Sequence, residues 1–373
     1  MHYTQRFGEK FCFTRAVVHA LRPIPMDAPF YDSTMGPFNT VKISYWMELY
    51  DKDGTMGQAP VSEFMLKGIL PLVLTGKSET YKDIYNRVYW QNRNNGFSSE
   101  VYNDLGRFDY IINDILAKRK NQSLHRYLGA TRDWVNVYAS GHGTNTSIQE
   151  LVSEAESFKS LGYTVYKMKV ATNFGSDNKG DAERVRIMRE TIGPQAKLAI
   201  DANQVWNAEE AMAFYDLVAR YDIYWYEEPV NSHDLAELEK LTKMCPSIIS
   251  MGESFRNHHL FKAYADAGVR FLQYNLFGLE DWQKVRDLAK ERGLMFSSGS
   301  LPMISAYFAT TDESCYQEYL KPTNGPVLRY MKIKPEERDG KFFIPDVPGS
   351  PMVPDWEKLD KDNYLDGRKY YYP

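Results

Sequence analysis

From Trp134 onward, short apolar runs alternate with longer stretches in which apolar residues recur at helical spacing. The short runs are rich in β-branched and aromatic residues, as expected of buried strands. There are eight of them, at 134–140, 164–170, 196–202, 222–228, 247–253, 270–276, 294–300 and 315–319. Regular alternation of strand and helix predicts βα units around a parallel sheet, and eight units favour a closed barrel.

Two of the longer stretches carry clear helix-boundary signals. In 147–162, Ser147 and Glu150 have the spacing of a capping box. The stretch 181–193 ends on Gly193, a residue typical of helix C-termini. We therefore expect a helix in each stretch.

Residues 1–133 have a different pattern. Strand-like runs at 13–21 and 41–51 flank a turn-rich segment, and helical patterns follow, ending in GRFDYIINDILAKRKNQSLHRYLG. Beyond Leu320 the chain is too rich in Pro, Gly and charge for a further βα unit. We predict an α+β domain over 1–133, a barrel over 134–325, and a C-terminal segment over 326–373 that packs back on the first domain.

The composition and net charge of the chain limit the kinds of molecule that it is expected to bind. The chain of 373 residues is 43% hydrophobic, carries a net charge of −4 and has a pI near 6.0. It therefore has no basic surface for nucleic acid or anionic lipid. Its three cysteines form no Cys-x-x-Cys, and it contains no apolar run of membrane-spanning length. The first residues show no apolar h-region or small-residue cleavage site, so we expect no signal peptide. We expect a cytoplasmic protein without disulfides.

Three acids end successive predicted strands. Asp201, Glu227 and Glu253 follow one another at equal spacings of 26 residues. Active sites of such barrels lie at the C-terminal ends of the strands. Three carboxylates that converge there repel one another unless a cation lies among them, and oxygen ligands suit Mg²⁺. The alternative is that these acids cap helices or face solvent.

Two lysines precede this set on the second strand. Lys167 and Lys169 are two residues apart, so both side chains face the barrel interior. Crowded ammonium groups lower each other's pKa, which would make a neutral lysine available as a base. Alternatively, the lysines pair with the carboxylates as a structural network. Asn203 follows Asp201 by the same step of two and is a candidate to bind a ligand.

Taken in order, these motifs resemble one family. Lys-x-Lys at 167–169, Asp-x-Asn at 201–203, Glu-x-Pro at 227–229 and Gly-Glu at 252–253 resemble the enolase superfamily, in its mandelate racemase/muconate lactonizing group. The segments 106–129 and 339–351 also resemble parts of that family's capping domain. The resemblance implies a (β/α)7β modified TIM barrel with a cap built from both termini, a homo-oligomer (dimer or octamer), and Mg²⁺ held by Asp201, Glu227 and Glu253.

The chain departs from the family pattern at two positions. Gly299 stands where the racemase branch has a His on the seventh strand, and Asn275 stands where that branch has an Asp on the sixth. The sixth strand also lacks the lysine of the lactonizing branch. Racemisation needs a proton taken from one face and returned to the other, so a two-base racemase is disfavoured.

Other residues are candidates to replace the missing His and Asp or to bind the substrate. His142, just after the first strand, is predicted to lie at the barrel mouth and to bind substrate or donate a proton, although it could be a solvated loop residue. Glu318 on the eighth strand is expected either to stabilise an oxyanion or to form an ion pair. Tyr31, Asp32 and Trp90, in the loop stretches 30–39 and 89–97, are candidate substrate contacts.

The resemblance implies Mg²⁺-dependent abstraction of a proton α to a carboxylate. The leading hypothesis is an acid-sugar dehydratase, in which Lys169 takes the proton, Lys167 tunes it and neutralises the substrate carboxylate, and an enediolate then loses water. The same chemistry would serve a cycloisomerase of a sugar lactone or anhydro-sugar acid. Two further alternatives are a non-catalytic sugar-acid-binding relative and a metal-independent glycosidase.

Overall fold

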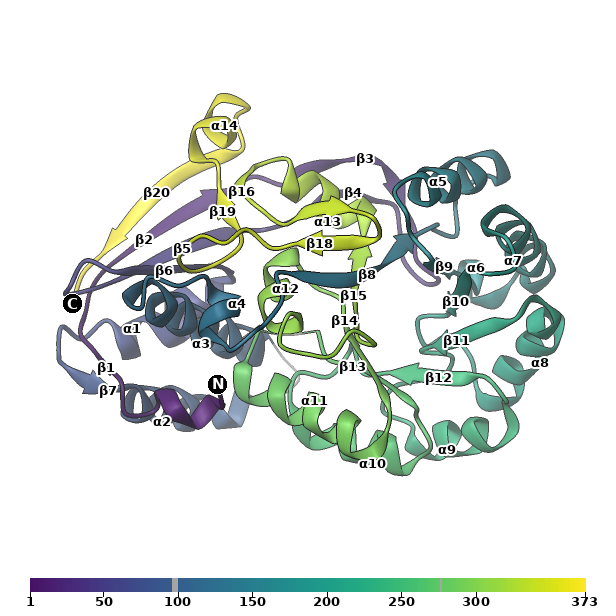
Figure 1. Cartoon of the computed structure of the whole chain (residues 1–373), viewed down its shortest axis with the longest axis horizontal. Coiled ribbons are helices and arrows are strands. Elements are labelled where there is room, and N and C mark those ends of the chain that lie inside the picture. Colours follow the sequence, from purple (N-terminus) through teal and green to yellow (C-terminus); the bar gives the residue numbers. More distant parts are fainter. Residues whose placement is uncertain (96–99, 276) are drawn as a thin grey trace.

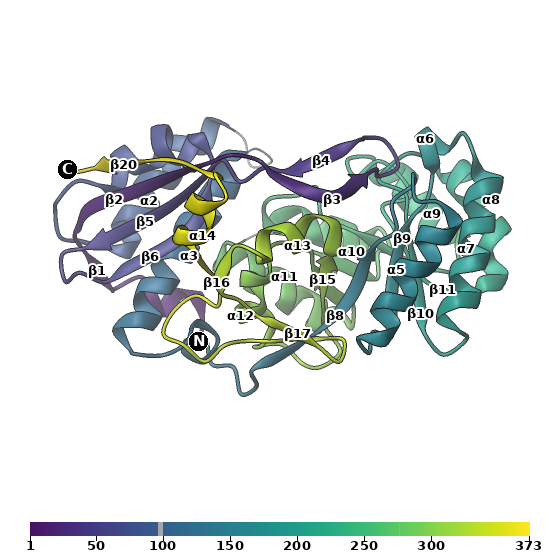
Figure 2. The same cartoon turned by 90° about the horizontal axis from the view of Figure 1, so that it is seen from above.

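The computed structural model describes residues 1–95, 100–275 and 277–373. Figures 1 and 2 show a barrel on one side and an α+β body on the other. We call the α+β body the cap; it consists of N-terminal elements together with strand β20 (Leu365–Tyr371) of the tail. Its long hairpin of β3 (Ile24–Phe30) and β4 (Phe38–Val41) reaches across to the barrel (Figure 2). The chain therefore has the two bodies that its pattern predicts.

The barrel is closed by eight parallel strands. Each pairs with its sequence neighbours, and the last pairs with the first. All eight predicted runs are strands, because their apolar residues fill the barrel interior and the layer beneath the helices. The strands are β8 (Trp134–Gly141), β9 (Val165–Lys169), β10 (Lys197–Asp201), β11 (Ile223–Glu227), β12 (Ile248–Met251), β13 (Phe271–Gln273), β14 (Met295–Ser298) and β15 (Tyr316–Leu320).

Helices cover the outside of the barrel. Ser147 and Glu150 form the predicted capping box at the start of α5, and Gly193, with φ +83°, ends α7. These two helix boundaries are confirmed. The helical segments are α5 (Ile148–Ser160), α6 (Thr172–Gly175), α7 (Asn178–Ile192), α8 (Ala208–Val218), η4 (Ala219–Tyr221), α9 (Leu235–Met244), η5 (His258–Leu260), α10 (Phe261–Asp266), α11 (Leu279–Arg292), η6 (Pro302–Ile304), α12 (Ser305–Phe308) and α13 (Lys321–Leu328).

The cap is a four-stranded antiparallel sheet with helices packed on it. Its strand order is β20-β2-β5-β6, and α3 packs across β6. The N-terminal elements are η1 (Tyr3–Arg6), β1 (Lys10–Phe11), β2 (Phe13–Leu21), β5 (Tyr45–Asp51), β6 (Met56–Val61), η2 (Met65–Ile69), α1 (Leu70–Val73), β7 (Glu79–Thr80), α2 (Tyr81–Asn92), η3 (Arg93–Asn95), α3 (Glu100–Arg119) and α4 (Leu124–Tyr127).

The structure differs from the sequence-based expectation at the β3–β4 hairpin. The segment 23–40 was expected to be turns, yet most of it is paired strand, with Ile24 opposite Val41 and Phe30 opposite Phe38. Prolines within β3 hide the strand pattern, but an edge strand tolerates proline because it need not donate every ladder hydrogen bond.

The tail divides between the two bodies. β20 (Leu365–Tyr371) pairs with β2 of the cap, whereas β18 (Lys341–Phe343) pairs with β8 of the barrel. α13 follows the eighth strand directly, so this strand carries a helix that the sequence pattern did not predict. The other tail elements are β16 (Met331–Ile333), β17 (Glu336–Arg338), β19 (Val353–Pro354) and α14 (Trp356–Lys361).

All three cysteines are free thiols. Within residues 1–95, 100–275 and 277–373, no helix is long and apolar enough to span a membrane.

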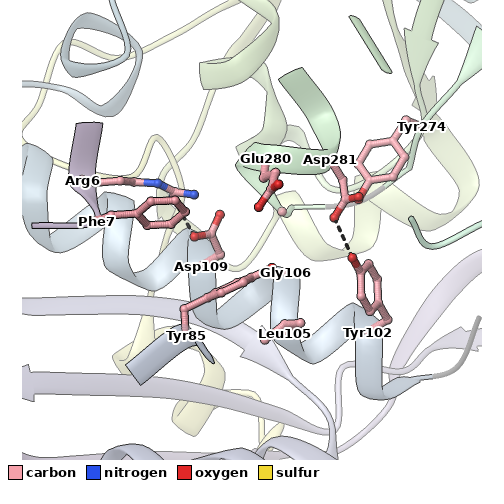
Figure 3. A pocket seen from close by; sticks show the side chains of 11 residues that line it. Arg6, Phe7, Tyr85, Tyr102, Leu105, Gly106, Asp109, Tyr274, Glu280 and Asp281 are labelled. Atoms are coloured by element: carbon pink, nitrogen blue, oxygen red, sulfur yellow. Dashed lines mark hydrogen bonds and ion pairs between the residues drawn. The ribbon is translucent and has the colours of Figure 1, made fainter. Parts of the chain in front are cut away.

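A buried charge joins the cap to the barrel. Asp109 of α3 forms an ion pair of 2.6 Å with Arg6 and accepts a hydrogen bond of 2.8 Å from the backbone N–H of Leu279, the first residue of α11. The same cap carboxylate thus caps a barrel helix. Figure 3 shows these side chains around a cavity of about 10 Å³, room for one water but not for a substrate.

We predict that Asp109→Ala lowers the free energy of unfolding by about 3–5 kcal/mol, because it leaves the Arg6 guanidinium buried without its counter-charge. Urea unfolding followed by circular dichroism measures the change. The matched control is Asp366→Ala, which removes an exposed carboxylate paired with Arg22 and should cost less than about 1 kcal/mol. Equal costs for the two variants would contradict the prediction.

Candidate active site

Three charged residues lie side by side at the C-terminal ends of adjacent strands. Lys169 of β9 is the register partner of Asp201 of β10, which is the register partner of Glu227 of β11. Because register partners have the same height in a sheet, the three side chains meet at one level of the barrel. Glu253 follows the end of β12 by two residues.

Lys167 is the centre of a buried charge network. Its Nζ lies 3.1 Å from Asp201 and 2.8 Å from Glu318 of β15, and it also forms an ion pair with Glu227. Lys169 Nζ lies 2.6 Å from the same Asp201 oxygen. One ammonium group therefore contacts three carboxylates, and the Asp201 oxygen bridges the two lysines.

The second oxygen of Glu227 is also bound. It accepts hydrogen bonds of 3.0 Å from Trp225 Nε1 and 2.7 Å from Gln273 Nε2. The sequence reasoning missed both donors. Their signal was present, since Trp225 stands two residues before Glu227 on the same face, and Gln273 is a lone amide in an apolar strand.

The crowding of acids in the site shifts their pKa values. Burial raises the pKa of Glu227 to about 8; the charge of Lys167 opposes this rise, and the charges of Asp201, Glu318 and Glu253 add to it. Burial and the charge of Asp201 likewise raise the pKa of Glu253. For Asp201 burial acts in the same direction, but the two lysines outweigh it and lower the pKa.

The pKa values of the two lysines shift in the direction opposite to the one expected from the sequence. Burial is the largest single effect on Lys169 and lowers its pKa. The charges of Asp201, Glu253 and Glu227 together outweigh burial, so the net pKa lies above the ordinary value. Lys167 behaves in the same way because of Glu227 and Glu318. The prediction that crowding of the two ammonium groups lowers a lysine pKa is therefore wrong for this arrangement, because the carboxylates counter the repulsion between them.

The acids have the chemistry of a cation site, although they are spread apart. Among the residues that the structure describes, no group of three His, Cys, Asp or Glu side chains has the spacing to hold a metal ion. Lys167 lies between Asp201 and Glu227 and accounts for the separation of those two. The donors of Asp201, Glu227 and Glu253 are nevertheless all carboxylate oxygens, and the acids mutually raise the pKa of both glutamates. This donor set fits Mg²⁺.

Backbone strain gathers at the same ends of the strands. Left-handed φ values occur at His142 (+51°), Ala171 (+61°), Asn203 (+45°), Gln204 (+68°) and Glu228 (+39°). None of these is a glycine. Such strain persists only where surrounding contacts enforce it, and it is concentrated at functional sites.

A loop of the cap reaches into the barrel mouth beside Asn203. Ser33 is buried, and its Oγ donates to Val170 O at 2.6 Å and to Asn203 Oδ1 at 3.2 Å. Asn203 N donates to Asp201 Oδ1 at 3.1 Å. Asn203 therefore links the cap loop to a site carboxylate. Sequence reasoning named Asn203 but missed Ser33, because a serine in a turn-rich segment carries no signal of its own.

The other loop candidates have different surroundings. Tyr31 N donates to Asn145 Oδ1 at 3.1 Å, so Tyr31 stands near the loop after β8. Asp32 Oδ1 accepts from Thr34 N at 2.7 Å and Met35 N at 2.6 Å, as in a loop-stabilising turn. Trp90 is 58% exposed and packs edge-on against Tyr89 of its own helix. Residues 96 and 97 of the candidate stretch 89–97 lie outside the described residues.

The predicted orientation of His142 is wrong. Its backbone follows the end of β8, but its side chain is fully buried against α5, where Nδ1 lies 2.7 Å from Glu154 and the ring packs edge-on to Phe158. Its backbone has a left-handed φ of +51° directly after the strand. His142 is thus a buried partner of a helix residue and does not face the site acids.

The two departures from the family pattern lie together. Gly299 N donates to Asn275 Oδ1 at 2.6 Å, so the amide lies across the end of β14. Glu318 takes part in the Lys167 network from the next strand. The ion-pair alternative for Glu318 is therefore the one that the structure contains.

Comparison with known proteins places the chain in a family. Residues 150–358, more than half of the chain, match the model of enolase C-terminal domain-like proteins. The chain is 24% identical over 352 residues to the 3,6-anhydro-alpha-L-galactonate cycloisomerase of Streptomyces coelicolor, covering 91% of this chain and 96% of that protein. It is 28% identical over 276 residues to the L-talarate/galactarate dehydratase of Salmonella typhimurium, covering 71% and 67%.

The fold agrees with this match. The solved structure of the Salmonella typhimurium L-talarate/galactarate dehydratase, liganded with Mg and L-lyxarohydroxamate, has a TM-score of 0.85 at 19% identity, covering 98% of this chain and 95% of that chain. The chain therefore belongs to the enolase superfamily of enzymes, in its mandelate racemase/muconate lactonizing group.

Proposed function

We propose that this protein is a Mg²⁺-dependent dehydratase of an acid sugar. The observation that carries the proposal is the register of Lys169, Asp201 and Glu227 on three adjacent strands, with Lys167 buried among the acids. This arrangement sets a potential base beside a carboxylate cluster that fits a divalent cation. The dehydratase activity of the Salmonella relative also supports it.

Asp201, Glu227 and Glu253 would hold the Mg²⁺. When bound, the ion supplies positive charge that stabilises the negative charge developing on the substrate carboxylate. Support comes from the all-oxygen donor set and from the Mg bound in the related dehydratase structure.

Lys169 is the proposed base. Its Nζ lies at the level of the acids. A cation held by Asp201 would offset the charge that raises the pKa of Lys169, and the neutral amine would then take the proton α to the substrate carboxylate. Once protonated, the same ammonium group would deliver that proton to the departing β-hydroxyl, so that water leaves and Lys169 returns to its neutral form. This single-group route needs no residue on the opposite face. It also assigns no role to His142, which contacts α5 instead.

Lys167 and Glu318 would form the floor of the site. Lys167 contributes positive charge toward the substrate carboxylate, and Glu318 holds Lys167 in place through the 2.8 Å ion pair. Gly299 is what allows this position of Glu318. A Cβ atom at residue 299 would lie far inside the contact distance of Glu318 Oε2.

A cycloisomerase is the second candidate. The Streptomyces coelicolor relative, which matches 91% of this chain, is a cycloisomerase of an anhydro-sugar acid. The same α-proton abstraction would then be followed by opening of a ring ether rather than by loss of water. We expect a polyhydroxylated acid as substrate in either case. Its candidate contacts are Asn203, which follows β10, and Tyr31, Asp32 and Trp90 of the cap.

We further expect a cytoplasmic homo-oligomer, a dimer or an octamer, that acts on a small molecule and has no nucleic-acid or membrane partner. The net charge of −4 and the three free thiols support this expectation. We also propose that the boundaries between the cap, the barrel and the C-terminal segment lie at residues 133 and 325.

We predict that Lys169→Ala lowers α-proton exchange and turnover at least about 100-fold, because it removes the base. The measurement is proton NMR in D₂O with Mg²⁺ and a library of mono- and diacid sugars, their lactones and anhydro-sugar acids. A 2-keto-3-deoxy product identifies a dehydratase, and a ring-opened isomer identifies a cycloisomerase.

The matched control is Lys197→Ala. Lys197 begins β10 at the opposite end of the barrel, where it pairs with the Tyr224 hydroxyl at 3.1 Å. Full activity of Lys169→Ala would reject the assigned base. Binding of an acid sugar by the wild type without exchange or turnover across the library would instead support the non-catalytic alternative.

Metal removal gives an independent prediction. Treatment with EDTA followed by dialysis should abolish turnover, and Mg²⁺ should restore it, because the carboxylate cluster then regains its counter-charge. Metal content by mass spectrometry verifies the removal. Unchanged turnover by the metal-free protein would contradict the proposal and favour hydrolysis without a metal, which chromogenic glycosides would detect.

We predict that Gly299→Ala lowers the free energy of unfolding by about 1–3 kcal/mol, because the added methyl collides with Glu318. In a Glu318→Ala background the same substitution should cost much less, and urea unfolding of the four proteins measures the coupling. Gly8→Ala is the control, since nothing lies within 4 Å of its Cβ position. Equal costs in both backgrounds would show that Gly299 does not make room for Glu318.

A further inference from the structure

We propose that Arg184 is a positioning residue for Lys169. The inference rests on the proposed function, in which Lys169 is the base. Arg184 belongs to α7, which lies outside the barrel wall near β9 and β10 (Figure 1), and its side chain is buried. It therefore acts from the helix layer, on the far side of the strands from the carboxylate cluster.

The Arg184 guanidinium binds the backbone at the ends of two strands. The Nη1 atom donates a hydrogen bond of 3.1 Å to the carbonyl oxygen of Lys169. The Nη2 atom donates to the carbonyl oxygens of His142 at 3.3 Å and Gly143 at 2.7 Å. A single side chain thus ties the residue after β8 and the loop behind it to the last residue of β9.

These carbonyls mark the point where the regular ladder ends. Lys169 N still donates to His142 O at 3.2 Å, but the left-handed φ of His142 turns the chain away from β9. The carbonyl of Lys169 then has to find a donor outside the sheet, because a buried backbone acceptor without a partner is unfavourable. Arg184 supplies that donor, and its planar fork reaches both strand ends at once, which a lysine cannot do.

Asp181 extends the restraint to the loop after β9. Its Oδ1 accepts from Arg184 at 2.9 Å and from Thr172 Oγ1 at 2.7 Å, while its Oδ2 accepts from Thr172 N at 2.7 Å. This loop contains left-handed residues at Ala171 (+61°) and Phe174 (+58°). The pair of Asp181 and Arg184 therefore fixes a strained segment that begins two residues after the base.

Fixing the backbone of Lys169 matters because its side chain has to act at a set distance. A displacement of about 1 Å at a reacting group costs on the order of 100-fold in rate. The residues proposed to hold Mg²⁺ stand on or just after β10, β11 and β12, and Arg184 touches none of them. Loss of Arg184 should therefore impair proton abstraction while leaving Mg²⁺ affinity intact.

Arg186 provides a matched control on the same helix. Its guanidinium is half-exposed and pairs with Glu183 at 2.6 Å and Glu190 at 2.5 Å. The two arginines are alike in the sequence and two residues apart. They differ in that the helix turns one toward the strand ends and the other toward solvent.

The experiment compares Arg184→Met, Arg184→Ala, Arg184→Lys and Arg186→Met, using the acid sugar that wild type turns over in the NMR library. We expect Arg184→Met to lower kcat and α-proton exchange about 100-fold, with KM and the Kd for Mg²⁺ within about 3-fold of wild type. Arg184→Lys should lose less, and Arg186→Met should be unchanged. Millimolar guanidinium added to Arg184→Ala should restore part of kcat, because the ion can occupy the vacated position.

Each outcome bears on the inference. Full kcat of Arg184→Met, with Lys169→Ala inactive, overturns the role of Arg184 and leaves the proposed function intact. A parallel loss of kcat, KM, Mg²⁺ affinity and melting temperature without guanidinium rescue shows a merely structural role and also overturns it. If Lys169→Ala itself stays active, the proposed function fails and the positioning role falls with it.

Discussion

One ammonium group among three buried carboxylates is the constraint on which the site depends. Lys167 contacts Asp201, Glu227 and Glu318, and none of the four side chains is more than slightly exposed. Buried charges are stable only when they are paired and hydrogen-bonded. Even with Lys169, the cluster has more acids than bases once Glu253 is counted. An excess of buried acids at a barrel mouth is the condition under which a divalent cation is stabilising, because the cation favours their ionised form.

The surrounding structure holds these charges at fixed positions from three sides. Gln273 and Trp225 donate to Glu227 from within the barrel. Ser33 reaches Asn203 from the cap, and Arg184 holds the carbonyl of Lys169 from the helix layer. These contacts also enforce the left-handed residues at the strand ends. Cap, barrel and helix layer therefore converge on a single group of charges, and contact by the cap limits the access of water that would screen them.

The parts of this arrangement that repeat along the chain were predictable, and the parts made by single contacts were not. The barrel follows from eight apolar runs, and the placement of Asp201, Glu227 and Glu253 at consecutive strand ends follows from their equal spacing. The side chain of His142 was misplaced, because its contacts with Glu154 and Phe158 of a neighbouring helix leave no pattern in the sequence. The role of Arg184 was invisible, because only the packed structure distinguishes it from Arg186.

The glycine at 299 changes the chemistry as well as the packing. The space that a side chain would take at the end of β14 is filled by the carboxylate of Glu318, which is itself bound to Lys167. The space at the end of β14 therefore holds an acid that is ion-paired with Lys167 rather than a second base. A reaction that inverts a carbon needs a proton donor and acceptor on both faces. Elimination or ring opening needs only one, so this arrangement favours a lyase or cycloisomerase over a racemase.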